Sequence, residues 1–215
     1  MQGKVSAVNR QRHSGHIQGD DGALLYFDAA AFLKKEDQAD VTIGMTVTYD
    51  AEGDRAYNLE LVDKEAFLRS ERAYTEPPLF ELRKSPFMEG YEVIDRGAYP
   101  ILKVSRHFEE ARGELIGDLK KLGANTGLNF KVTEETRPTM GYAFLYYHLS
   151  AFPAVCGKPD PKGEITQGEL ASRLDHKAIK SQGLKQQNVA IARLALKITL
   201  GLLIAVFTLG FFLTL

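Results

Sequence analysis

The sequence lacks several features that would place it in a common class of protein. Its 215 residues include one cysteine, Cys156, so no disulfide can form within the chain, and a lone thiol is typical of a reducing compartment. The formal net charge is −1, so no overall charge attracts the chain to nucleic acid or to anionic lipid. Residues 1–7 lack the basic start and the apolar core of a signal peptide. We therefore expect the N-terminal part of the chain to stay in the cytoplasm.

Patterns typical of catalysis or metal binding are also missing. The sequence has no phosphate-binding loop, no dinucleotide-binding glycine pattern and no nucleophile elbow, so we expect a protein that is not an enzyme. The histidines and the cysteine do not have the spacing of metal ligands, and we predict neither a metal site nor a cofactor. Cys156 lies in the apolar run 154–156, which favours a buried structural thiol over a catalytic one.

The most distinctive feature that is present is a long uncharged stretch at residues 198–215. As a helix this stretch would span about 27 Å, close to the hydrocarbon thickness of a bilayer. Apolar residues begin near position 189, and Lys197 is placed where its ammonium group can reach the membrane interface. We therefore predict a transmembrane anchor over 189–215. The residues predicted to lie in the bilayer are Ile198, Leu202, Leu203, Ile204, Val206, Phe207, Phe211 and Phe212.

The distribution of charge predicts the orientation of this anchor. Five basic side chains lie between residues 175 and 197, against a single acidic one, Asp175. An excess of lysine and arginine before a span places that side of the chain in the cytoplasm. We expect a single-pass protein of the inner (cytoplasmic) membrane, inserted after synthesis in the manner of a tail anchor. Membrane lipid is the first partner that the sequence predicts.

The first 62 residues contain a series of short strand signals. Two candidate strands flank the turn at 19–22, whose Asp-Gly pair tolerates positive φ, and two more alternate with period two on either side of the turn at 50–54. Five short strands with turns at this spacing predict a small closed β-barrel of the oligonucleotide-binding type.

This segment resembles the cold-shock domain. The resemblance rests on scaffold residues that occur in the family's order, namely Gly3-Lys4-Val5, Asn9, Gly15, Ile17, Gly19-Asp20-Asp21-Gly22, Gly44-Met45-Thr46-Val47 and Asn58-Leu59. It implies a five-stranded barrel whose outer sheet surface stacks on the bases of single-stranded nucleic acid.

The stacking surface departs from that family. Ala7 stands at the position of the family's tryptophan, Ser14 and His16 replace two phenylalanines, and Asp28 replaces a histidine, whereas Tyr26 keeps an aromatic ring. Each lost stacking contact removes about 1–3 kcal/mol of binding free energy per base. The first 62 residues also carry six basic against ten acidic side chains, a net charge of −4, which opposes phosphate binding.

Two functions remain open for the barrel. In the first, a basic and aromatic strip retains weak binding to RNA or single-stranded DNA. The candidate residues of that strip are Lys4, Arg10, Arg12, His13, His16 and Tyr26. In the second, the barrel no longer binds nucleic acid and is a membrane-tethered interaction or assembly module, whose partners are other proteins or a second copy of the chain.

The rest of the chain predicts an α+β multidomain protein. The predicted boundaries are a barrel over 1–62, a helix and linker over 63–88, an α+β domain over 89–158, a polar helix or linker over 159–188 and the anchor over 189–215. The α+β domain contains an amphipathic helix over 107–122, with Ser105 as its N-cap and Gly123 as its left-handed end. A capping box at Thr166 predicts a further helix over 167–180.

Two features of the predicted α+β domain bear on function. Its helix and turn, Glu110-Ala111-Arg112, Leu119 and Leu122-Gly123-Ala124-Asn125, are similar to a small α+β bacterial family named for heavy-metal binding, but no ligand spacing accompanies them. An aromatic strand follows over 141–150, in which Tyr142, Tyr146 and His148 share one face. Such a strip binds a ligand in some proteins and is more typical of a core or a subunit interface.

Overall fold

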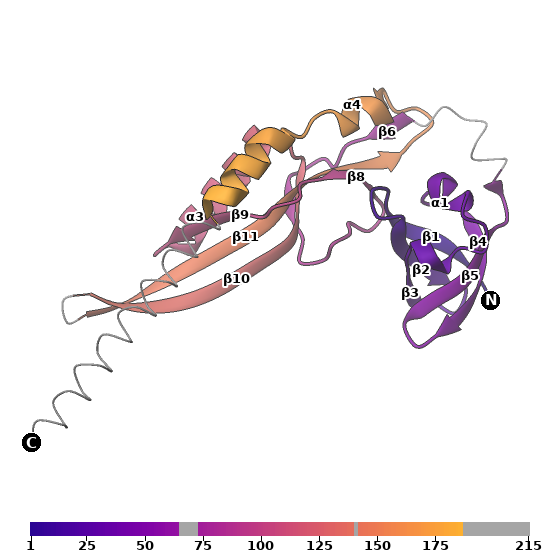
Figure 1. The fold of residues 1–215 in the computed structure, drawn as a ribbon, viewed down its shortest axis with the longest axis horizontal. Helices are drawn as coiled ribbons and strands as arrows, with labels where there is room; N and C mark the ends of the chain where they lie inside the picture. Colours follow the sequence, from indigo (N-terminus) through magenta and orange to yellow (C-terminus); the bar gives the residue numbers. More distant parts are fainter. Residues whose placement is uncertain (65–72, 140–141, 187–215) are drawn as a thin grey trace, which may run out of the picture.

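A computed structural model describes residues 1–64, 73–139 and 142–186 of the chain (Figure 1). Most of the charged helix predicted after residue 63 and the whole of the anchor predicted over 189–215 lie outside these ranges. Among the helices within them, none has the length and the apolar character needed to cross a membrane.

The first 61 residues form a closed barrel. Its strands are β1 (Gln2–Asn9), β2 (Ser14–Gly19), β3 (Leu24–Phe27), β4 (Thr46–Glu52) and β5 (Arg55–Leu61). Strand β1 pairs with β2 and β4, β3 joins β2 to β5, and β4 pairs with β5, so that the ring closes. The predicted five-stranded barrel is therefore confirmed. The short helices η1 (Ala29–Ala31) and α1 (Asp37–Asp40) lie between β3 and β4.

The barrel is filled by the apolar side chains that alternate along its strands. Ile17 and Leu59 are fully buried, and the rings of Phe27 and Phe32 meet edge to face with their centroids 5.6 Å apart. Strands β1 and β2 approach so closely that a Cβ at Gly15 would overlap the carbonyl oxygen of Ala7. Glycine at this position is thus a requirement of the packing.

The second unit consists of residues 73–186 and combines a mainly antiparallel sheet with helices. Its strands are β6 (Ala73–Thr75), β7 (Glu81–Leu82), β8 (Glu92–Arg96), β9 (Ile101–Ser105), β10 (Thr126–Thr139), β11 (Tyr142–Pro159) and β12 (Ile165–Thr166). Strand β11 has 18 residues and pairs with β10 along one edge, and with β8 and then β9 along the other. In Figure 1 the β10–β11 hairpin projects at the end of the molecule opposite the barrel.

Helix α3 (Phe108–Lys121) covers one face of this sheet. Its buried residues Ala111, Leu115 and Leu119 recur at the spacing of one helix face and join the core that includes Leu149 of β11. The helix lies within the predicted range, and Gly123 after it has the expected positive φ of 84°. The N-cap residue is His107 and not Ser105, because the chain is still extended at 105, the last residue of β9.

Two other elements differ from their predictions. Strands β6 and β7 lie in the segment predicted as a linker, where they pair with β11 and β10 over only two residue pairs each. Such short strands are determined by distant partners and leave no periodic pattern in the sequence. The predicted capping box at Thr166 is present, but α4 (Gln167–Ala171) ends early, and a separate helix occupies residues 176–186.

The barrel and the second unit are joined by main-chain hydrogen bonds. Strand β8 lies parallel to the end of β1, with Val8 opposite Glu92 and Asn9 opposite Val93. The N–H of Arg10 donates to the carbonyl oxygen of Val93 at 3.1 Å. The sheet of the second unit is thereby continuous with the barrel.

Cys156 is completely buried, and this burial raises the pKa of its thiol to about 12 from an ordinary value of 9.0. We expect a thiol reagent at pH 8 to leave the native chain unmodified and to react once urea unfolds it. Because the thiol ionises more readily in the unfolded chain, its contribution to stability is complete below pH 9 and falls as the pH rises toward 12. Rapid labelling of the native chain at pH 8 would contradict a buried thiol.

Candidate functional site on the outer face of the barrel

Three of the six predicted nucleic-acid contacts lie on one face of the barrel. The pairing of Lys4 with Gln18 and of His16 with Tyr26 places their side chains on the outer surface of β1, β2 and β3. Lys4 is exposed, whereas His16 and Tyr26 are half-buried. The rings of His16 and Tyr26 meet edge to face with centroids 6.2 Å apart.

A segment of the second unit covers this face. Phe87 is 5% exposed, and its ring centroid lies 4.5 Å from that of His16 and 6.3 Å from that of Tyr26. A carboxylate oxygen of Glu89 lies 3.0 Å from Nδ1 of the same histidine. The position where a base would stack on His16 is therefore occupied by a phenylalanine of the same chain.

The cover continues over the neighbouring strand. The N–H of Gly90 donates to the carbonyl oxygen of Ser6 at 3.1 Å. Ala7, which replaces the family's tryptophan, is fully buried although it lies outside the cluster of side chains that fills the barrel. A small residue beside His16 leaves room for a segment that packs directly on the strand.

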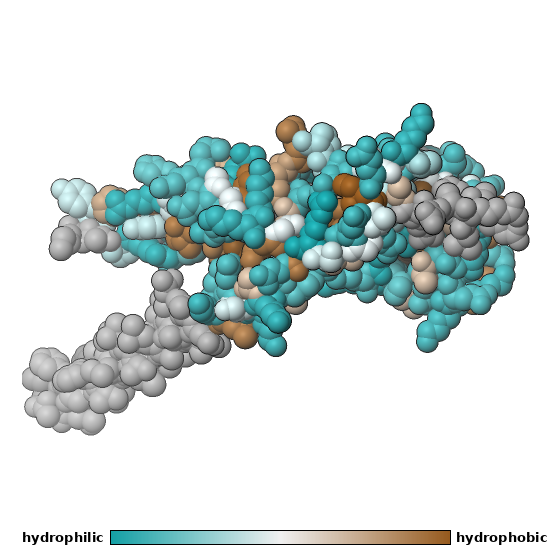
Figure 2. Space-filling view, turned by 90° about the horizontal axis from the view of Figure 1, so that it is seen from above, coloured by the Kyte–Doolittle hydropathy of each residue, from teal (hydrophilic) through white to brown (hydrophobic). Residues whose placement is uncertain are grey.

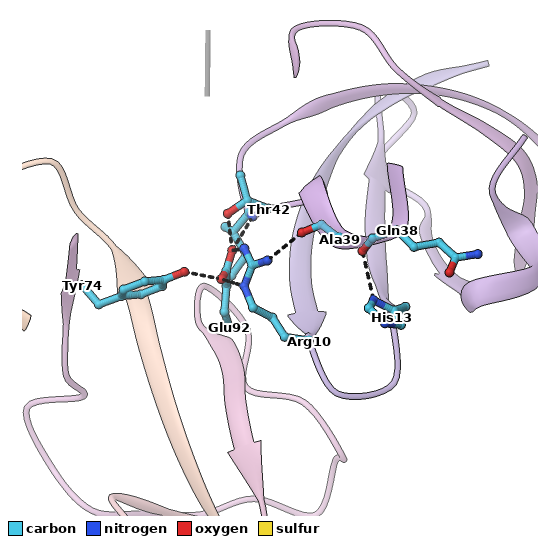
Figure 3. Close-up of polar contacts among 8 residues, drawn as sticks. Arg10, His13, Gln38, Ala39, Thr42, Tyr74 and Glu92 are labelled. Carbon is cyan, nitrogen blue, oxygen red and sulfur yellow. Dashed lines mark hydrogen bonds and ion pairs between the residues drawn. The ribbon is translucent and has the colours of Figure 1, made fainter. Parts of the chain in front are cut away.

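Arg10 forms an ion pair with the buried carboxylate of Glu92 (Figure 3). Its Nε and Nη2 donate to the two oxygens of Glu92 at 2.6 and 3.1 Å, and its Nη1 donates to the carbonyl oxygen of Ala39 at 3.2 Å. Glu92 also accepts from the hydroxyl groups of Thr42 and Tyr74. Both oxygens of this carboxylate are thus satisfied by groups from the barrel and from the second unit.

Both side chains of the Arg10–Glu92 pair are nearly removed from solvent, with 10% and 0% exposure. Burial of the guanidinium by itself would lower the pKa of Arg10, but the charge of Glu92 and its hydrogen bonds outweigh this effect, and the pKa is raised. Arg10 is charged at any physiological pH and is not available to a phosphate group.

The two remaining candidates lie in the turn between β1 and β2. His13 has a positive φ of 47°, and its Nδ1 lies 3.1 Å from the carbonyl oxygen of Gln38, so it lies in the turn and not on the outer sheet face. Arg12 is exposed. Burial of Arg96 lowers the pKa of its guanidinium, and the positive charge of Arg12 lowers it further. The structure therefore separates the six candidates into an outer face, a buried ion pair and a turn.

One part of the barrel surface remains open. A depression of about 580 Å³ lies between β3 and the β4–β5 turn, and Tyr26, Arg55 and Tyr57 line it. The guanidinium carbon of Arg55 lies 5.7 Å from the ring centroid of Tyr26. Asp28 and Glu52 line the same depression, and their carboxylates oppose the approach of a phosphate.

The residues that determine the state of this face were not identifiable from the sequence. Phe87 and Glu92 lie more than 70 residues from the side chains that they contact, His16 and Arg10. Phe87 stands in the polar, proline-containing segment that was predicted as a linker, and Glu92 precedes two apolar residues as an ordinary strand residue. Neither has a local pattern that indicates a distant partner.

Comparison of the chain with protein-family models, with curated proteins and with solved structures gives no match. Function is therefore inferred from the contacts of these side chains alone.

Proposed function

We propose that this chain is a membrane-tethered interaction module, in which the outer face of an oligonucleotide-binding type of barrel binds the second unit of the same chain instead of nucleic acid. The observation that carries this proposal is Phe87, which packs on His16 and is almost completely buried. The strand order of the ring and the resemblance of residues 1–62 to the cold-shock domain support the type of barrel. The uncharged stretch at 198–215 supports the tether.

Charge favours the same conclusion. The barrel segment has a net charge of −4, and Arg10 at its interface with the second unit is neutralised by Glu92. Nucleic acid would have to displace the Phe87 segment and overcome this charge without the phosphate contacts that supply most non-specific affinity. A segment of the same chain binds the barrel without displacing a competitor or contacting phosphates, because it is present at a high effective concentration.

A second candidate function is weak binding of single-stranded nucleic acid in the open depression. The observation that favours it is the exposed ring of Tyr57 beside Arg55 and Tyr26, since aromatic rings and arginine are the groups on which bases stack. The acidic lining of the depression limits this function to low salt concentrations.

Oligonucleotide binding distinguishes the two candidates. We expect the full chain in detergent to leave the fluorescence anisotropy of a labelled oligopyrimidine unchanged at low salt, because Phe87 occupies the stacking position. Phe87→Ala is expected to give detectable binding at low salt only, since each uncovered ring regains about 1–3 kcal/mol of stacking per base. The matched control is Leu79→Ala, which changes an apolar side chain that is 74% exposed.

Binding by the unchanged chain that is lost in Tyr57→Ala would overturn the proposed module and establish the second candidate. Binding by Phe87→Ala that persists at high salt would contradict the expected role of charge. The co-sedimentation measurement described below tests the membrane tether separately.

A further inference from the structure

The free end of the β10–β11 hairpin exposes two large side chains, one aromatic and one apolar. Strand β9 pairs with β11 only as far as Tyr147, so residues 142–146 have β10 as their partner among the described strands. On this stretch Tyr142 is 72% exposed and Leu145 is 40% exposed. Figure 2 shows that hydrophilic residues cover most of the described surface seen from this side, and that hydrophobic ones form separate patches. An exposed apolar hairpin end is typical of a surface that meets a partner.

The sheet face that turns away from α3 adds positive charge to this end. The register puts Lys131 and Arg137 of β10 on the same face as Phe144 and Tyr146 of β11, and Arg106 joins them from the end of β9. Among the described β10 and β11 residues of this face, Glu135 is the acidic one, and it is paired with Arg137 and His148. This face thus carries three cations and one carboxylate, although the whole chain has a net charge of −1.

The rings on this face are already covered by guanidinium groups. The Cζ of Arg106 lies 3.9 Å from the ring centroid of Phe144, and the Cζ of Arg137 lies 4.7 Å from that of Tyr146. Nucleic acid would need open ring faces for its bases to stack on. A lipid surface needs only exposed apolar groups, tyrosine and cations, which are the side chains that collect at a membrane interface.

The helix at 176–186 points toward the hairpin end. Its first residue, His176, pairs with Asp95 at 2.7 Å, Ile179 lies against Gly97, and Gly183 lies against the ring of Tyr99. These contacts advance along the chain from β8 toward β9, and β9 runs beside β11 toward the free end of the hairpin. The chain therefore leaves the described region in the direction of that end.

The length of the chain beyond this helix matches the reach of the hairpin. Ile198, where the uncharged stretch begins, lies fifteen positions after Gly183, which corresponds to about 22 Å as a helix or about 50 Å when extended. Strand β11 extends about 30 Å from Ala151, opposite the start of β9, to Tyr142. The hairpin end falls between these limits, so the predicted tether allows it to reach the bilayer surface.

We propose that the free end of the β10–β11 hairpin, defined by Tyr142, Phe144, Leu145, Arg106 and Arg137, lies in the headgroup layer of an anionic bilayer. This inference rests on the proposed membrane tether and names the second contact with the same membrane. Tyr142 and Phe144, and Leu145 on the opposite face of the hairpin, enter the boundary between headgroups and acyl chains, while the guanidinium groups bind lipid phosphates. Two points of attachment hold the second unit, and the barrel joined to it, in one orientation to the membrane.

The absence of tryptophan from the chain permits a direct test. Tyr142→Trp is introduced into the full chain, which is reconstituted into phosphatidylcholine vesicles containing phosphatidylglycerol, and co-sedimentation with the vesicles is measured first. We expect the tryptophan emission in vesicles to lie at shorter wavelength than that of the same variant in detergent at high salt. We also expect it to be quenched by lipids that are brominated near the headgroup. Adding Arg106→Gln and Arg137→Gln is expected to reduce the quenching. Leu145→Trp provides a second probe in case Tyr142→Trp does not fold.

The matched control is Leu79→Trp, whose parent side chain has an exposure of 74%, similar to that of Tyr142. It precedes β7, which pairs with β10 at Thr126 and Gly127, the end of the strand nearest the barrel. We expect no quenching at this position.

Four outcomes decide the inference. Quenching at positions 142 or 145 but not at 79 supports it. Co-sedimentation without quenching at 142 and 145 overturns it and leaves the tether intact. Failure to co-sediment overturns the proposed tether and this inference with it. An emission change on adding an oligonucleotide, without one on adding lipid, assigns the face to nucleic acid and overturns the lipid contact.

Discussion

Replacing Glu92 with glutamine is expected to lower the free energy of unfolding by about 3–5 kcal/mol, because it leaves the buried guanidinium of Arg10 without its counter-charge. Glutamine keeps the shape of the side chain and removes its charge. Its NH₂ group also presents a donor where Arg10, Thr42 and the N–H of Ile43 all donate. Urea denaturation of the full chain in detergent, followed by circular dichroism, measures the change.

The size of this effect is checked against an exposed ion pair. Glu60 pairs with Lys34 at 3.0 Å, but the two side chains are 48% and 57% exposed, so Glu60→Gln is expected to give no measurable change. A double-mutant cycle with Arg10→Gln then separates the coupling of the buried pair from the loss of the other hydrogen bonds. Equal, small effects of Glu92→Gln and Glu60→Gln would show that the buried pair does not stabilise the junction.

The second large effect is expected from Gly123→Ala at the end of α3. Gly123 has a φ of 84°, where an L side chain costs about 1–2 kcal/mol. A Cβ at this position would also overlap the carbonyl oxygen of Arg173, and forcing such a contact typically costs a further 1–3 kcal/mol, roughly. We expect Gly123→Ala to reduce the free energy of unfolding by about 2–5 kcal/mol.

Gly22 provides a matched control for this substitution. Its φ is 83°, almost the same, but a Cβ there would have no atom within 4 Å. Gly22→Ala should therefore show the conformational cost alone, about 1–2 kcal/mol. The same denaturation experiment on both variants measures the steric part as their difference. If the two variants lose the same free energy of unfolding, the segment at 173–174 moves to accommodate the added methyl group without loss of stability.

The barrel was predictable because its signals are local. The Asp-Gly turn at 19–22 and the alternation on either side of 50–54 specify hairpins from neighbouring residues. The apolar residues that alternate along these strands form much of the cluster that fills the barrel. Helix α3 was predictable for the same reason, from the spacing of Ala111, Leu115 and Leu119 and the glycine that follows.

The state of the candidate site was not predictable, because it depends on contacts between distant parts of the chain. Lys4, His16 and Tyr26 share an outer face, as alternation implies, but nothing near them in the sequence indicates that Phe87 covers it. From the sequence alone Arg10 is predicted to be a free cation, whereas the structure pairs it with Glu92. A hydrogen bond over 82 residues has no signature in composition or periodicity.

The position of Glu92 in the chain has a consequence for biosynthesis. All five barrel strands are complete once Leu61 has been translated, but Phe87, Glu89 and Glu92 are still to be made. At rates of about 5–20 residues per second, the 31 residues from Leu61 to Glu92 take the ribosome roughly 2–6 s. During that interval the nascent barrel carries an unpaired Arg10 and an uncovered His16. A cellular ligand that competes with the chain's own segment for this face binds most easily during this interval, before the segment with Phe87 has left the ribosome.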